Sequence, residues 1–534
     1  MSRTPLLRSL RQLVRDARAS RTSGIPVDEI QDIRTERRLS RRGFLAGAAA
    51  GATALALPRV ARASGPQPSV TIVGGGIAGL TCALTLADAG YTSTVYEAAG
   101  RVGGRMFTNT TSYFGGQVTE WGGELVDSGH KTVRRLANRF NLPLDNLLNA
   151  QPANSRDIYR FDGRYYAATA ADADFFAMAG ALDDDLEAAD FPTTFDAFTP
   201  AGRALDKMTV RQWINSRVPG GYASKLGQVL DTAYAIEYGA DTTQQSALNL
   251  IYLLGYQPTG AQMDIFGESD EKFHIRGGNQ QLPTAIAARL GASVRTGYSL
   301  VRLAETAHGR YRLTFERGNS TTEVVSDYVV LALPFAVLRD IDTSGAGFDA
   351  RKRRAINQLG RGHNGKLQLQ FAQRAWIGTG AWPGKANGSS YSDSGYQASW
   401  DATRAQSGTA GILVLYSGGS VTDAMKTTSP FATAADAKVQ LDAERGYAQI
   451  RQTFPAVSWN GKATQSLPHK SPFFNASYSF YKPGQYTDFG GHEGARQNNV
   501  YFCGEHTSLE FQGFMEGGAI TGQDVAQKLI KKLR

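Results

Sequence analysis

Three glycines and one glutamate near residue 74 have the spacing of a site for a dinucleotide phosphate. Gly74, Gly76 and Gly79 form a GxGxxG pattern, and Glu97 lies 21 residues after Gly76. Glycines at this spacing allow a tight turn and let backbone N–H groups approach a pyrophosphate, and a carboxylate at this distance accepts a hydrogen bond from a ribose hydroxyl. We therefore predict a dinucleotide site, and the acidic residue disfavours NADP because it would repel a 2′-phosphate.

One lysine lies in a segment that alternates between apolar and polar residues. Leu367, Leu369 and Phe371 share one face of a predicted strand, and Lys366 lies on the other face with two glutamines. A lysine on that face is either solvated or directed toward a site. The alternation alone does not decide between these two interpretations.

The elements that must position these residues alternate between strand and helix. We predict a buried strand over 69–73, a helix over 80–89 and a second strand over 92–96, which together form a strand, glycine turn, helix and strand unit. Further apolar strands are predicted over 327–334 and 499–504. Dinucleotide-binding elements therefore occur at both ends of the chain.

The expected fold class is α/β with two intertwined domains. A Rossmann-type dinucleotide-binding domain is built from the discontinuous segments 64–150, 271–340 and 485–534. An inserted α+β substrate-binding domain with a mixed sheet takes the segments 151–270 and 341–484, where the composition changes to helical and acidic and then to strand-like and aromatic.

Composition and charge exclude several classes of protein. The 534 residues are 42% hydrophobic, which is enough for a large core. The net charge of +9 is concentrated in residues 1–63, which hold 13 Arg, no Lys and 5 acidic residues, so no nucleic-acid partner is expected. Only Cys82 and Cys503 occur, and the seven histidines show no metal-ligand spacing, so we predict no disulfide framework and no metal.

The basic N-terminal segment has the features of an export signal. Ser40-Arg41-Arg42-Gly43-Phe44-Leu45 precedes an apolar run rich in Ala and Gly, and Ala61-Arg62-Ala63 offers small residues for cleavage. Segment 1–63 resembles a twin-arginine signal, which implies transport by the twin-arginine export machinery to the periplasm or outside the cell. An uncleaved N-terminal anchor is the alternative.

Four motifs in order resemble those of the flavin-containing amine oxidase family, with monoamine and polyamine oxidases as the nearest type and L-amino-acid oxidases as relatives. The motifs are the run from Glu97 to Arg105, the run Thr119 to Glu124, Arg276-Gly277-Gly278-Asn279, and the C-terminal pair 504–508 and 513–519. The resemblance covers the chain from about residue 69 to its C-terminus. It implies an FAD-binding Rossmann-type domain.

The resemblance also implies which residues hold FAD. Arg105 would contact the phosphates, Gly122 to Leu125 would line the flavin ring, Val294 would hold the adenine through its backbone, and Glu505 would meet the ribityl-pyrophosphate. The full expected set is Gly74, Gly76, Ile77, Ala78, Gly79, Glu97, Ala98, Gly103, Gly104, Arg105, Gly122, Gly123, Glu124, Leu125, Val294, Gly504, Glu505, Gly513, Phe514 and Met515. Members with covalent flavin carry a cysteine where this chain has Ser477, so non-covalent FAD is expected.

The same resemblance implies three catalytic residues. Lys366 would bond through a water to flavin N5, and Tyr478 and Phe514 would form the two walls of an aromatic cage for the amine. Core packing of either ring is the alternative. The chain departs from many relatives at Pro468, where they carry a tryptophan, so one wall of the site beside it is not predicted.

The substrate class is predicted from two acids near the flavin. Glu124 and Asp127 follow Gly122-Gly123 where L-amino-acid oxidases have an arginine, and carboxylates there would attract a second cationic nitrogen. Alternatively, these acids bond flavin hydroxyls or helix N–H groups. With Tyr478 and Phe514 they complete the expected substrate-binding set.

The expected function is FAD-dependent oxidative deamination of a mono-, di- or polyamine to an imine and then an aldehyde, with O2 reduced to H2O2. One alternative is an L-amino-acid oxidase that gives a 2-oxo acid and ammonia, with Arg276 binding the carboxylate. Others are an amine dehydrogenase that uses a quinone or cytochrome as acceptor and a non-catalytic flavin-binding module. A homodimer stays open.

Overall fold

A parallel sheet of five strands carries the dinucleotide motif. The computed structural model describes residues 67–258 and 262–534, so the predicted signal at 1–63 lies outside the described residues. The strand order is β24 (Val500–Phe502), β13 (Tyr328–Leu331), β1 (Val70–Val73), β2 (Thr94–Glu97) and β9 (Val294–Thr296). All neighbours pair in parallel. The central strands are short, apolar and buried on both faces, as expected for a parallel sheet covered by helices.

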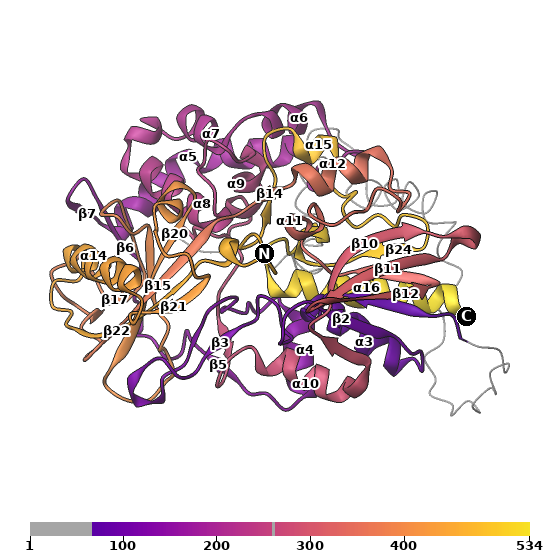
Figure 1. Cartoon of the computed structure of the whole chain (residues 1–534). Coiled ribbons are helices and arrows are strands. Elements are labelled where there is room, and N and C mark those ends of the chain that lie inside the picture. The colour runs from indigo at the N-terminus through magenta and orange to yellow at the C-terminus, as the bar shows by residue number, and fades with distance from the viewer. Residues whose placement is uncertain (1–66, 259–261) are drawn as a thin grey trace, which may run out of the picture. The chain divides into compact units, whose positions relative to one another are not determined.

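Helices from distant parts of the sequence pack beside this sheet. α3 (Ile77–Asp88) begins directly after the glycines, and α16 (Met515–Leu533), α10 (Gln281–Leu290) and α4 (Lys131–Arg139) complete the cluster (Figure 1). α16 approaches α3 closely because Gly522 has no side chain: a Cβ there would lie 2.1 Å from the carbonyl oxygen of Ala78. The C-terminal helix is therefore part of the cofactor domain.

An antiparallel sheet of three strands follows β9 in the sequence. It contains β10 (Ser299–Glu305), β11 (Tyr311–Arg317) and β12 (Ser320–Ser326), in that order. Its inner side chains, Leu303, Leu313 and Phe315, are fully buried. This sheet connects β9 to β13 of the parallel sheet.

A second large sheet of eight strands is mixed. Its order is β21 (Phe431–Thr433), β22 (Trp459–Ser466), β15 (Asn364–Phe371), β20 (Gly411–Gly418), β19 (Ala398–Asp401), β18 (Ser390–Ser392), β6 (Ile158–Phe161) and β7 (Arg164–Tyr166). β18 pairs with β6 in parallel, and the other neighbours are antiparallel. α14 (Ala437–Thr453) packs against β15 and β22.

The alternation predicted for β15 is confirmed. Leu367, Leu369 and Phe371 lie in an apolar core with side chains of α14. On the other face, Gln368 Nε2 donates to the carbonyl oxygen of Glu120 in β4, and Lys366 Nζ donates to that of Gly122, just after β4. The sheet therefore directs Lys366 toward the residues of the second motif.

Five helices form a layer over the other end of this sheet (Figure 1). They are α5 (Ala168–Ala189), α6 (Pro200–Lys207), α7 (Val210–Arg217), α8 (Lys225–Tyr238) and α9 (Ala247–Leu254). Thr199, Thr209, Ser224 and Ser246 cap four of them through side-chain oxygens. No helix among the described residues is long and apolar enough to cross a membrane.

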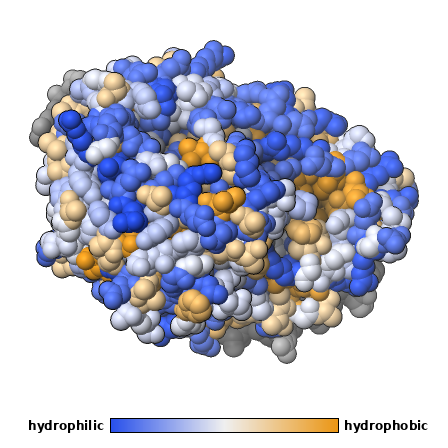
Figure 2. All heavy atoms as spheres, turned by 60° about the vertical axis from the view of Figure 1, so that its left-hand side comes forward, coloured by the Kyte–Doolittle hydropathy of each residue, from blue (hydrophilic) through white to orange (hydrophobic). Residues whose placement is uncertain are grey.

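Shorter elements complete the chain. The helices are α11 (Phe335–Leu338), α12 (Ala350–Gln358), α13 (Ser420–Asp423) and α15 (Gln485–Asp488), and the strands are β3 (Thr108–Asn109), β4 (Thr119–Glu120), β5 (Leu144–Asn146), β8 (Phe273–Ile275), β14 (Gly360–Arg361), β16 (Ile377–Gly378), β17 (Ala386–Asn387) and β23 (Ser479–Phe480). Figure 2 shows a face that is mostly hydrophilic, with hydrophobic side chains in separate small groups.

The predicted fold class is confirmed. Every strand of the parallel sheet comes from the segments assigned to the FAD-binding domain, and every strand of the mixed sheet comes from the segments assigned to the substrate-binding domain. Residues 68–534 form one compact unit, so the two sheets belong to a single body.

Candidate functional site

A cavity of about 820 Å³ lies between the glycine motif and the mixed sheet. All the predicted cofactor residues line it except Gly79 and Val294, and the predicted catalytic residues Lys366, Tyr478 and Phe514 line it too. We call the part lined by residues of the helical layer and the mixed sheet, together with the segment 262–271, the substrate side. The part lined by the glycine motif is the cofactor side.

The cofactor side has room for a pyrophosphate against the start of α3. A Cβ added at Gly76 would meet no atom within 4 Å, and no side chain caps this helix N-terminus, so the first-turn N–H groups are available to an anion. Gly79 has a different role: a Cβ there would lie 2.0 Å from the oxygen of Gly74, so this glycine allows α3 to pack on β1. These features fit a bound dinucleotide.

Glu97 lies at the end of β2 and faces the same turn. Its Oε2 accepts a hydrogen bond from the N–H of Gly75 at 2.6 Å, and its Oε1 accepts one from the N–H of Ala99 at 2.8 Å. Burial raises the pKa of Glu97, although these N–H groups oppose the shift. Each carboxylate oxygen has a second lone pair, so the group can still accept a ribose hydroxyl.

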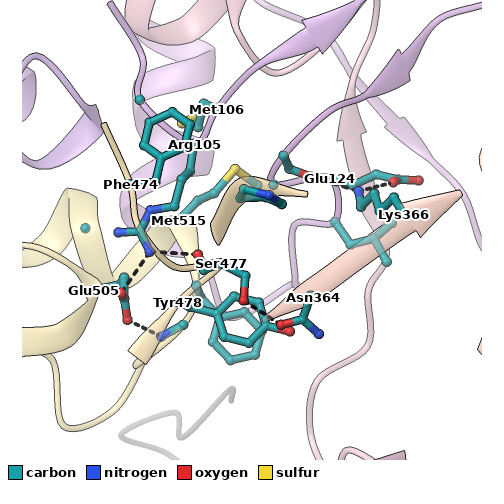
Figure 3. A pocket seen from close by; sticks show the side chains of 18 of the residues that line it. Arg105, Met106, Glu124, Asn364, Lys366, Phe474, Ser477, Tyr478, Glu505 and Met515 are labelled. Atoms are coloured by element: carbon teal, nitrogen blue, oxygen red, sulfur yellow. Dashed lines mark hydrogen bonds and ion pairs between the residues drawn. The ribbon is translucent and has the colours of Figure 1, made fainter. Parts of the chain in front are cut away.

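Arg105 and Glu505 form an ion pair in the wall of the cavity. Arg105 Nη1 lies 2.9 Å from Glu505 Oε1 and also donates to the carbonyl oxygen of Ser477 (Figure 3). Glu505 Oε2 accepts from Ser479 Oγ and from the N–H of Gly513. This pair joins the first motif of the resemblance to the C-terminal one.

Lys366 is held by two oxygens of the second motif. Its Nζ donates to the carbonyl oxygen of Gly122 at 2.8 Å and to Glu124 Oε2 at 2.7 Å (Figure 3). Glu124 Oε1 accepts from Trp400 Nε1 at 2.8 Å. Burial would raise the pKa of Glu124, but the ammonium of Lys366 and these hydrogen bonds outweigh it and lower the pKa. The carboxylate is therefore ionised and neutralised by Lys366.

Tyr478 is fixed from the substrate side. Its hydroxyl donates to the carbonyl oxygen of Ile236, at the end of α8, and lies 3.0 Å from the hydroxyl of Tyr416. Phe514 packs its ring against His130 with centroids 5.2 Å apart. Both rings line the cavity, and their role as a cage stays a prediction.

The thiols of the chain are remote from the cavity. Cys82 and Cys503 are fully buried in the core around the parallel sheet, and neither lines the cavity. Ser477 bonds Asn364 Oδ1 through its hydroxyl. No cysteine of the described residues can therefore attach a flavin in this cavity, which agrees with the prediction of non-covalent FAD.

Two predicted substrate contacts need correction. Asp127 is 1% exposed and does not line the cavity; its carboxylate accepts from Ser269 Oγ and from the N–H of Glu271, so it holds a loop in place. Arg276, the alternative contact for a carboxylate, is exposed and pairs with Asp145 at 2.7 Å. Glu124 lines the cavity, but its charge is already matched by Lys366.

The prediction that Val294 holds the adenine receives no support from the cavity lining. Val294 lies in β9, pairs with Val95 of β2 and packs against the core beside α3 and α10. The lining residues nearest to it in the sequence are Tyr298, Ser299 and Leu300, at and just before the start of β10.

Several residues of the substrate side carry no motif and were not predicted. The polar ones that matter below are Asp157, Glu237, Glu271 and Arg404, and the aromatic ones are Tyr391, Trp400 and Tyr416. They come from α8, from the loop before β8, and from β6, β18, β19 and β20 or the loops beside them.

One grouping outside the cavity bears on the prediction of no metal. His363, Asp423 and His469 have ligand atoms within 4.8 Å of one another. The two imidazole rings are stacked with an interplanar angle of 13° and centroids 4.4 Å apart. Lone pairs in two nearly parallel planes do not converge on one ion, so metal binding here would require a ring to turn.

The fold and cavity define a dinucleotide-binding protein with a two-part site. The chain matches the Flavin containing amine oxidoreductase family over residues 77–530. The protein belongs to this family, and its cofactor is FAD.

Characterised relatives are similar over almost the whole chain. A nicotine dehydrogenase of Pseudomonas putida is 26% identical over 93% of this chain and 99% of its own length, and an L-amino acid dehydrogenase of Synechocystis is 22% identical over 90% and 98%. Among solved structures, cyclohexylamine oxidase from Brevibacterium oxydans superposes with a TM-score of 0.72 at 20% identity and covers 88% of this chain and 100% of its own.

Proposed function

We propose that the protein oxidises an amine with O2 as the electron acceptor. The net reaction consumes a primary amine, O2 and water and gives an aldehyde, ammonia and H2O2, so that two electrons and two protons pass from the amine to O2. FAD supplies the two-electron acceptor when bound. The observation that carries the proposal is the Lys366 ammonium, held by Gly122 and Glu124 in the same cavity as Tyr478 and Phe514.

The chain's own residues position the reactants. Tyr478 and Phe514 offer two ring faces to the amine, and the hydroxyl bonds of Tyr478 to Ile236 and Tyr416 fix one of these faces. Lys366 Nζ uses two of its three N–H donors on Gly122 and Glu124, so one remains that would stabilise negative charge on a bound flavin. No side chain is required as a nucleophile.

The location of the enzyme belongs to the same proposal. The twin-arginine pattern at Arg41-Arg42 supports export of a folded protein, which suits an enzyme that binds its cofactor before transport. The product H2O2 would then be released outside the cytoplasm.

The test is anaerobic mixing of the purified protein with candidate substrates. We expect the flavin absorbance to bleach with an amine and to recover in air with release of H2O2. Bleaching without recovery in air would replace O2 by another acceptor, such as a quinone. Absence of bleaching with every amine and amino acid would refute the proposal.

An L-amino acid is the second candidate substrate. Arg404 lines the substrate side and donates to the carbonyl oxygen of Asp401 and to Gln151 Oε1, so its guanidinium is close enough to the cavity to meet a carboxylate. Bleaching by amino acids alone would favour this reaction, which gives a 2-oxo acid in place of an aldehyde.

A further inference from the structure

Two glutamates of the substrate side have no partner. Glu237 lies in the last turn of α8 and Glu271 in the loop before β8, and both line the cavity. Within residues 67–258 and 262–534, neither carboxylate has a hydrogen bond or an ion pair. Unpaired carboxylates at half-buried positions such as these are costly unless a cation or a proton accompanies them.

Three of the cations that line the cavity are already paired with carboxylates. Lys366 pairs with Glu124, Arg105 with Glu505, and Arg156 with Asp172 at 2.8 Å. Arg404 is the remaining arginine of the lining, and it acts on the carboxylates of Asp157 and Glu271 on the substrate side. The substrate side therefore carries an excess of negative charge.

The raised pKa values of Glu237 and Glu271 agree with this excess of negative charge. Burial and the neighbouring Glu271 raise the pKa of Glu237 to about 8, and burial and Asp127 raise the pKa of Glu271 to about 7. A proton accompanies this pair of carboxylates near neutral pH when no other cation is present. A cationic ligand can replace that proton.

The position of the pair relative to the predicted cage is defined by Tyr478. The hydroxyl of Tyr478 bonds the carbonyl oxygen of Ile236, and Glu237 is the next residue of α8. The carboxylates of Glu237, Glu124 and Glu271 all act on the phenol of Tyr416, whose hydroxyl meets that of Tyr478. The unpartnered acids therefore line the cavity beside the hydroxyl end of Tyr478.

Asp127, which the sequence suggested as a substrate contact, holds the backbone of Glu271 in place. Glu271 has a φ of 43°, in the left-handed region that few side chains adopt, and its N–H donates to Asp127 Oδ1. Tyr391 and Trp400 also line the cavity, and aromatic rings are favourable neighbours for a cation.

We infer that the substrate carries a second cationic group and that Glu237 and Glu271 bind it while the reacting amine lies at Tyr478 and Phe514. This inference rests on the proposed function and specifies its substrate class. Two kinds of molecule share the required chemistry: a diamine or polyamine, and an amino acid with a basic side chain. Arg404 is the residue that would meet the carboxylate of the second kind.

A set of four substrates separates the two questions. Cadaverine and pentylamine differ by the second cation, and L-lysine and L-norleucine repeat this difference on molecules that also carry a carboxylate. The measurement is the second-order rate constant of anaerobic flavin bleaching by each. We expect cadaverine to exceed pentylamine, or L-lysine to exceed L-norleucine, by about tenfold or more.

Two variants and a matched control test whether Glu237 and Glu271 cause the preference for a dicationic substrate. Glu237→Gln and Glu271→Gln keep the side-chain size and remove the charge, and each should reduce the preference for the dication by about tenfold. Glu187→Gln removes the same charge from an exposed position of α5 and should leave the preference as it is. FAD content and circular dichroism identify a variant that has lost its fold.

A second readout requires no turnover. Under anaerobic conditions cadaverine or L-lysine should raise the midpoint of thermal unfolding more than its monocationic counterpart, and Glu237→Gln should remove this difference. Equal bleaching within both pairs, or a preference that survives both glutamate variants, would overturn the inference and leave amine oxidation standing. If none of the four substrates, and no other amine or amino acid, bleached the flavin, the proposed function would fail and the inference with it.

Discussion

Lys366 brings to the cavity a positive charge that Glu124 already neutralises. The Glu124 carboxylate 2.7 Å away makes the pair nearly neutral, and the Gly122 carbonyl fixes where the ammonium points. A cationic amine can therefore approach this end without meeting a bare positive charge. Glu124 acts here as a positioning residue, and Trp400 holds its other oxygen.

Replacing Lys366 tests that assignment. We expect Lys366→Met to slow flavin reduction or reoxidation by about 100-fold, because one hydrogen-bond donor aimed at a reaction centre contributes on this order to rate. FAD should stay bound, since Lys366 contacts no residue of the glycine motif. Stopped-flow absorbance measures both half-reactions. Lys528→Met, at an exposed position of α16, is the control, and unchanged rates in Lys366→Met would remove the role.

The unpartnered glutamates predict a pH-dependent stability. Glu237 faces Glu271 and Asp127, and Glu271 also faces Arg404, Asp157 and Glu124. Both pKa values are raised in the folded state, to about 8 and about 7, above the value of about 4.3 for an unfolded glutamate. The stability that they contribute is therefore present below pH of about 4 and is lost as the pH rises through 7 to 8.

The measurement is thermal unfolding of the substrate-free protein between mildly acidic and mildly alkaline pH. We expect the midpoint of thermal unfolding of the wild type to fall as the pH rises across this range. The midpoint of Glu237→Gln should fall less steeply. Glu187→Gln, with an exposed carboxylate, should keep the wild-type slope. Equal slopes in the wild type and Glu237→Gln would show that Glu237 does not carry a raised pKa.

Most residues that line the cofactor side could be predicted from the sequence, whereas Glu237 and Glu271 on the substrate side could not. The glycines and Glu97 act through short fixed spacings, because a phosphate turn imposes the same backbone on every chain that uses it. Glu237 and Glu271 come from a helix and a loop that meet only in three dimensions, so no spacing marks them. Asp127 was misassigned for the same reason: its distance from the flavin motif in sequence says nothing about which way its carboxylate points.

At the scale of elements, α3 and its turn decide how the cofactor side is shaped. Gly76 leaves space in front of the helix, and Gly79 brings the first turn of the helix against β1. The alternation along β15 directs Leu367 into the core of the mixed sheet and Lys366 toward the cavity. One face of this strand therefore stabilises the fold, and the other contributes to the site.

The close packing at Gly79 predicts a sensitive position. A Cβ would lie 2.0 Å from the oxygen of Gly74, so Gly79→Ala should push α3 from β1, destabilise the protein by about 1–3 kcal/mol and lower its FAD content. Urea unfolding and the ratio of flavin to protein absorbance measure the two effects. Gly100→Ala is the matched control, because a Cβ at Gly100 meets no atom within 4 Å. Equal stability of the two variants would contradict the role of Gly79.

At the scale of the whole molecule, the cofactor domain is closed by segments that are far apart in sequence. β1 and β2 come from the first part of the described chain, β9 and β13 from the middle, and β24 from the last part. The segments between them build the mixed sheet and the helical layer. The segments of one sheet are therefore separated in the sequence by those of the other, so neither sheet can be excised as one continuous piece of chain.

Export is the prediction that concerns the chain as a whole. Replacing both Arg41 and Arg42 by lysine in the full-length chain should abolish twin-arginine transport and leave active, FAD-loaded enzyme in the cytoplasm. Cell fractionation with an activity assay measures the distribution. Arg37 and Arg38 replaced by lysine, just before the pattern, provide the control. Equal export of both variants would contradict a twin-arginine route.

The contact of α16 with α3 also dictates the order of events during biosynthesis. The helix that receives the pyrophosphate is among the first described elements to leave the ribosome, and the helix packed on it is the last. A nascent chain that has not yet produced β24 and α16 lacks Glu505, Gly513 and Met515 from the cavity wall. The complete wall of the cavity therefore exists only after α16 has been translated, so we expect FAD loading to follow synthesis of the whole chain.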